Sequence, residues 1–202
     1  MRLITFLVLT AIFGDDVASV SITPNAVTGG ESATGTVNLS APAPAGGTSV
    51  TFTSNNPSVV VQGVRVAQGQ TSATFPIAST PVTANANATV TATVGKTSAT
   101  TTLTVNAPCV VALVLQLSVT NGVAGDGTLS GTIGLNGTAP SGGITVNLIS
   151  GGGNIGTVVV AQGKTSDAVK LNLADVTQLK DSTVTAQSGS CTGLAATVRK
   201  DL

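Results

Sequence analysis

The sequence predicts an all-β protein built from two similar antiparallel β-sandwich domains in tandem. Three observations lead to this expectation: one stretch of the chain is repeated, short runs alternate apolar and polar residues, and turn residues separate these runs. The chain has 202 residues, which is room for one large domain or two of about a hundred residues each. Valine and threonine dominate the alternating runs, and such β-branched side chains suit a pleated strand.

An internal repeat divides the chain into two units. Val27 to Ser54 aligns without a gap on Val123 to Ser150. The next connection differs in length, since twelve steps lead from Ser54 to Val66 but ten from Ser150 to Val160. Identical or nearly identical strings then follow, namely VAQGQTS at 66–72 with VAQGKTS at 160–166, and TVTA at 89–92 with TVTA at 183–186.

The repeat sets the expected organisation of the chain. The first strand begins near Ala18 in the first unit and near Val110 in the second, so the first unit is complete without residues 1–13, which have no counterpart in the repeat. We expect an apolar N-terminal segment at 1–16, a first domain at 17–107 and a second domain at 108–202.

Period-two alternation indicates strands throughout the first unit. In the run 35–40, Val37 and Leu39 lie on one face. The same spacing recurs at Val50 and Phe52, at Ala73, Phe75 and Ile77, at Val90, Ala92 and Val94, and at Leu103 and Val105. Turn signals separate the runs at 28–30, 42–47, 55–57, 68–69 and 95–96. About seven short strands in roughly ninety residues are typical of a sandwich.

The second unit departs from the first in one connection. Three glycines at 151–153 replace Asn55, Asn56 and Pro57, so we expect a looser loop there. No long apolar stripe of helical period occurs, and the best helix candidate, 173–179, is short.

Composition excludes several classes of function. The chain has no histidine, which excludes histidine-dependent triads, imidazole bases and imidazole metal ligands. Two cysteines are too few for a four-thiolate site. Eight basic residues against eight acidic ones leave no basic surface for nucleic acid, and tryptophan and tyrosine are absent. We expect no enzyme activity, no cofactor and no metal.

The first unit resembles the bacterial Ig-like repeats that occur in tandem in secreted and surface-anchored proteins. The resemblance is carried by VTGGESATGTVNLSAPAPAGGTSVTFTSNNPSVV, by QGQTSATFPI and by ATVTATVGKTSATTTLTV; it covers 18–107 well and the second unit more loosely. It implies two Ig-like sandwiches, an extracellular or cell-surface location, and a role as spacer, stalk or adhesive module. It provides no catalytic residue.

The segment MRLITFLVLTAIF at 1–13 has three interpretations: a secretory signal peptide, a retained assembly strand or short anchor helix, and a lipid-facing anchor. As a secretory signal peptide, it has Arg2 before an apolar run and Gly14 before two aspartates, although it is short and lacks an A-x-A site. As a retained assembly strand, it is apolar on both faces and pairs with the sheet edge of a neighbouring subunit. The expected subunit contacts are Leu3, Ile4, Phe6, Leu7, Val8, Leu9, Ile12 and Phe13. A membrane span is not expected, because crossing a bilayer takes about 20 apolar residues.

The two cysteines and three sequons are the remaining candidate sites. Cys109 opens the second unit and Cys191 lies near its last hairpin, so a disulfide between neighbouring first and last strands is expected. The alternative is a pair of buried free thiols. The candidate N-glycosylation sites are Asn38, Asn87 and Asn136.

These observations favour a non-enzymatic extracellular structural protein. The preferred interpretation is a subunit of a pilus-like filament or surface layer, whose partners are copies of itself. A charge content of 8% suits a surface that packs against its own copies, because few charges must be desolvated. The alternative is a secreted adhesion or glycan-binding module in which 1–14 is a signal peptide and the partners are cell-surface glycans or proteins.

Overall fold

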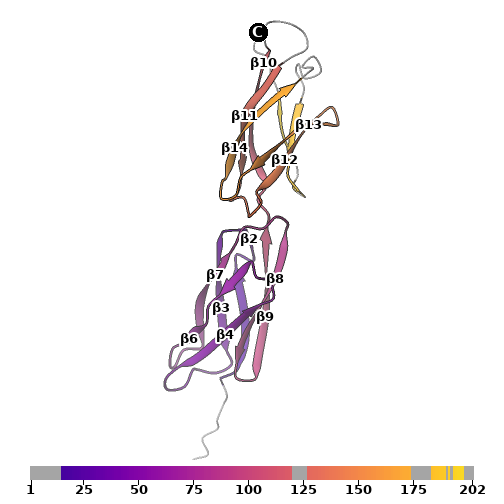
Figure 1. Ribbon diagram of the computed structural model, residues 1–202. Helices are drawn as coiled ribbons and strands as arrows, with labels where there is room; N and C mark the ends of the chain where they lie inside the picture. The colour runs from indigo at the N-terminus through magenta and orange to yellow at the C-terminus, as the bar shows by residue number, and fades with distance from the viewer. Residues whose placement is uncertain (1–14, 120–126, 174–182, 190, 192, 198–202) are drawn as a thin grey trace, which may run out of the picture.

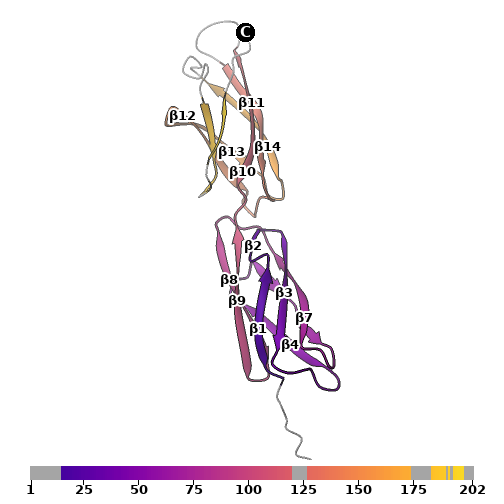
Figure 2. The same cartoon turned by 180° about the vertical axis from the view of Figure 1, so that it is seen from behind.

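The computed structural model describes residues 15–119, 127–173, 183–189, 191 and 193–197, and all regular structure in these residues is β-strand. The all-β class predicted from the sequence is therefore confirmed. Figures 1 and 2 show two sandwiches arranged end to end in an elongated molecule. The chain passes from one to the other between Asn106, which ends the last strand of the first sandwich, and Val110.

The first sandwich contains nine strands. They are β1 (Val17–Thr23), β2 (Ala26–Thr28), β3 (Ser32–Leu39), β4 (Thr48–Ser54), β5 (Val59–Val61), β6 (Val64–Val66), β7 (Ser72–Ser79), β8 (Ala86–Val94) and β9 (Thr97–Asn106). One sheet has the order β1-β3-β7-β5 and the other the order β2-β9-β8-β4-β6. If β1, β3, β4, β5, β7, β8 and β9 are lettered A to G, these sheets contain A-B-E-D and G-F-C, the arrangement of an Ig-like sandwich.

The second sandwich has seven strands among the described residues. They are β10 (Val110–Val119), β11 (Gly127–Leu135), β12 (Ile144–Ser150), β13 (Gly153–Val160), β14 (Ser166–Leu173), β15 (Thr183–Gln187) and β16 (Leu194–Thr197). The sheets have the orders β10-β11-β14 and β13-β12-β15-β16. The helix candidate at 173–179 lies outside the described residues except for Leu173, which ends β14.

Each sandwich encloses its own hydrophobic core. The two clusters of buried side chains share no residue. The alternation predicts the first core well, since Val37, Ile77, Leu103 and Val105 are fully buried. Phe75 packs over Gly35, and a Cβ atom at Gly35 would overlap its ring. Glycine at this strand position therefore makes room for the largest side chain of the core.

The structure has more strands in the first unit than the expected number of about seven. Two segments of the chain pass from one sheet to the other, and each of them forms two short strands instead of one. β1 pairs with β3 in one sheet, and after Pro24 the chain continues as β2, which pairs in parallel with β9 in the other. The segment 59–66 likewise pairs first with β7 and then with β4. Proline interrupts a ladder because it has no N–H to donate, which is consistent with the first switch.

Candidate interaction surfaces

The connection after β4 covers two sheet edges in the first sandwich. β5 lies beside the end of β7, with Val59 opposite Ser79 and Val61 opposite Ile77. The chain then crosses to the other sheet, where β6 pairs with β4 from Thr48 to Val50. Val59 is buried, at 4% exposure. The switching segment therefore adds an edge strand to both sheets and fills the gap between them.

The shorter connection of the second unit behaves differently. β13 pairs with β12 along its whole length, from Ile144 opposite Val160 to Ser150 opposite Gly153. The expectation of a looser loop at 151–153 is wrong. Gly151 and Gly152 have φ values of +57° and +83°, the positive angles that a tight two-residue hairpin requires. Glycine permits this turn, because it adopts such angles without a Cβ clash.

As a result, β14 is an edge strand of a three-stranded sheet in the described part of the chain. It pairs with β11 from Ser166 opposite Gly134 to Leu173 opposite Gly127, without a register shift. The Ala168 N–H donates to the Asp167 side chain at 2.9 Å, so it points away from β11. In an antiparallel strand, the N–H and C=O groups of successive residues point alternately to the two edges of the strand. The backbone groups of Lys170 and Asn172 therefore also point away from β11.

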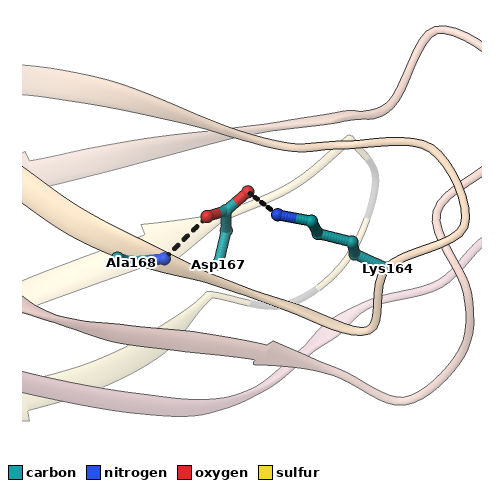
Figure 3. A network of polar contacts seen from close by, with 3 residues as sticks. All are labelled: Lys164, Asp167 and Ala168. Carbon is teal, nitrogen blue, oxygen red and sulfur yellow. Dashed lines mark hydrogen bonds and ion pairs between the residues drawn. The ribbon is translucent and has the colours of Figure 1, made fainter.

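An ion pair lies at the beginning of this edge. Figure 3 shows the Lys164 ammonium approaching one oxygen of Asp167 while the other accepts the Ala168 N–H. The N–O distance of the pair is 3.8 Å, and the two side chains are 59% and 27% exposed. Such an exposed pair contributes at most about 1 kcal/mol to stability. Charged side chains on an edge strand disfavour pairing with other strands. The ion pair therefore disfavours strand addition at the first half of β14.

A second surface is the uncharged outer face of β4, β8 and β9. The strand register places hydroxyl side chains in rows across these strands: Thr51, Thr93 and Ser98; Thr53, Thr91 and Thr100; and Thr89 with Thr102. All of them are exposed or half-exposed. None of the three strands contains a charged residue. A partner that covers only these three strands therefore desolvates no charged side chain of theirs, and Arg65 on β6 and Lys96 in the β8–β9 turn lie at the margin of the face.

A disulfide joins Cys109 and Cys191, with their Cα atoms 5.7 Å apart. It connects the residue before β10 to the turn between β15 and β16. Asn136 fixes the backbone of Cys109 by two hydrogen bonds. The Asn136 side-chain oxygen accepts from the Cys109 N–H at 2.7 Å, and the Asn136 backbone N–H donates to the Cys109 carbonyl at 3.0 Å. The alternative of two free thiols is thus excluded in this structure.

The three sequons have different surroundings. Asn38 on β3 is half-buried and donates from its side-chain amide to Ser19 at 2.9 Å. Asn87 on β8 is exposed and accepts from the Thr104 hydroxyl at 3.0 Å. Asn136 is exposed but its side chain supports Cys109. Asn87 and Asn136 are therefore the two exposed amides among the three candidates.

The described residues contain no group of three or more acidic or cysteine side chains placed to hold a metal ion. No helix among them has the length and apolar character needed to cross a membrane. A cavity of about 410 Å³ lies at the junction of the sandwiches and is lined by residues of both, including Pro108, Ile144 and Ser188. The Ser188 hydroxyl is buried and has no hydrogen-bond partner among the described residues. None of the described residues that line the cavity carries a titratable side chain, since Cys191 is disulfide-bonded.

The expected subunit-contact residues all belong to 1–14, which lies outside the described residues. Their contacts stay a prediction from the sequence. What sequence reasoning missed is that β14 lies at a sheet edge in the described part of the chain. The shorter connection was the available signal, but its consequence depends on which sheet the segment joins.

No protein-family model matches the sequence, and no curated protein matches it. Among solved structures, the chain is similar to the D0-D1 domain of intimin at 14% identity, covering 89% of this chain and 95% of that chain with a TM-score of 0.39. It is also similar to bovine butyrophilin at 12% identity, covering 89% of this chain and 97% of that chain with a TM-score of 0.42. These similarities concern the fold alone.

Proposed function

We propose that this chain is a non-enzymatic extracellular structural protein, a subunit of a pilus-like filament or surface layer joined through its apolar segment 1–13. The observation that carries the proposal is the segment itself, which is apolar on both faces and stands outside the repeat. Burying its eight large apolar side chains at about 1.5 kcal/mol each contributes roughly 12 kcal/mol before ordering costs.

Three features of the described structure support this proposal. The end-to-end sandwiches form an elongated unit (Figure 1), which suits the repeat of a fibre. The uncharged threonine face of β4, β8 and β9 is available for packing between copies. The disulfide is typical of oxidising, extracellular compartments.

The first test is the intact mass of the protein recovered from its native source, with and without reductant. A mature chain that retains Met1 supports the assembly role. Full-length protein and a variant lacking 1–13 are then compared by sedimentation and electron microscopy, and polymer should form only with the segment. A gain of two hydrogens on reduction tests the Cys109–Cys191 bond in solution.

A second candidate is a secreted adhesion or glycan-binding module. The order of Arg2, an apolar run and Gly14 favours it, because this is the layout of a signal peptide. A mature chain that begins near Asp15 overturns the filament role and leaves this candidate, whose binding should survive deletion of 1–13.

A further inference from the structure

We propose that the free edge of β14 in the second sandwich accepts a β-strand from another copy of this chain, and that this strand is the apolar segment 3–13. The inference rests on the proposed function, because it names the surface to which the N-terminal segment binds. It follows from a comparison of the two sandwiches within one chain.

The first sandwich shows what normally covers this position. There β5 lies beside β7, and Ile77 behind it is fully buried. The repeat aligns Ile77 with Leu171 of β14, which is only half-buried. Leu171 packs across the sandwich over Gly156, since a Cβ atom there would overlap its side chain. Among the described residues of the second sandwich, no strand occupies the place of β5.

The other edges of the second sandwich are less suitable acceptors. The register of β10 shifts between Val110 and Ala112, and this strand also packs against β16. The pairing of β13 shifts between Leu148 and Ile149. β16 is only four residues long. Because irregular or short edges resist strand addition, the eight-residue, unshifted β14 is the favoured acceptor.

Strand direction is compatible with end-to-end assembly. β10 leaves the junction at Val110, and β14 runs the same way because both strands are antiparallel to β11. β14 therefore ends far from the first sandwich. β1 begins at the opposite end of the molecule, beside the start of β9 (Figures 1 and 2), with the Val17 N–H donating to Thr97. A segment entering from the next copy thus runs parallel to β14, as β2 runs parallel to β9 within this chain.

Length and charge also fit this pairing. Eight residues of β14 extend about 26 Å and residues 3–13 extend about 36 Å, so the segment is long enough to span the edge. It enters at the Lys170–Leu173 end, where the outward backbone groups have no side-chain cap among the described residues. The cap by Asp167 lies at the other end, where the basic Arg2 of the incoming segment follows.

Photocrosslinking of assembled full-length chain tests the acceptor directly, with p-benzoylphenylalanine in place of Phe6. Trypsin cuts after Lys96, Lys164, Lys170, Lys180 and Arg199, which separates β14 from the other edges. Crosslinks between copies should map to peptides 165–170 or 171–180. Crosslinks to 97–164, which contains β10 and β13, or to 181–199, which contains β16, would overturn the assignment.

A graft provides a second test. Residues 55–65 replace 151–159, so that the second sandwich acquires the switching segment and β14 acquires a β5-like neighbour. The graft should abolish polymer, while the control Gly151→Asn should keep it, because asparagine tolerates the positive φ of the hairpin turn. If polymer forms without 1–13, the proposed function fails. If polymer requires 1–13 but persists in the graft, only the β14 assignment fails.

Discussion

Loss of the Cys109–Cys191 bond should destabilise the second sandwich selectively. The two cysteines are 82 residues apart, and the bond closes nearly the whole second unit into a loop. In the chain-entropy model, opening such a loop costs about 4.5 kcal/mol. Since 1 kcal/mol lowers the melting temperature of a small domain by about 4–8 °C, the second transition should fall by roughly 20 °C or more.

Differential scanning calorimetry of the wild type and of the Cys109→Ser, Cys191→Ser double variant measures this effect. The first sandwich is the internal control, because it has a separate core and no cysteine. Its transition should stay within a few degrees of the wild-type value, because mutations at distant sites without shared partners hardly affect each other's stability. A shift of less than about 5 °C in the second transition, or an equal shift in both, would refute the reasoning.

Three further outcomes follow from the structure. Gly35→Ala should lower the unfolding free energy of the first sandwich by about 1–3 kcal/mol in urea titrations, because the new Cβ meets the Phe75 ring. The control is Gly69→Ala at an exposed position with open space around it, which measures the cost of a positive φ alone. Gly152→Val should cost about 1–2 kcal/mol in the second sandwich, because a β-branched residue is strained at positive φ; an unchanged denaturation midpoint argues against the tight turn. Asp167→Ala should change stability by less than about 1 kcal/mol yet increase light scattering, because it uncaps the Ala168 N–H on the β14 edge; scattering equal to wild type contradicts this role of the ion pair.

Much of the architecture could be predicted from the sequence because it depends on local patterns. The alternation around Val37, Phe75 and Leu103 identifies strands and their inward faces, since neighbouring side chains on a strand point to opposite sides. The repeat predicts that the chain contains two sandwiches. The positions of Cys109 and Cys191 within the second unit predict a bond that the structure contains.

The candidate acceptor edge could not be predicted in the same way. Val59 and Val158 both lie in valine-rich runs that follow a turn, and nothing local tells which sheet either run joins. The structure places the first run across two sheets and the second run along one. The sequence by itself therefore determined the strands, the two cores and the apolar character of 1–13. Only the tertiary structure decided that β14 lies at a sheet edge among the described residues, because strand pairing joins residues far apart in the chain. The connection at 55–65 is two residues longer than that at 151–159, and whether this extra length lets the chain reach the second sheet depends on how far apart the two sheets lie.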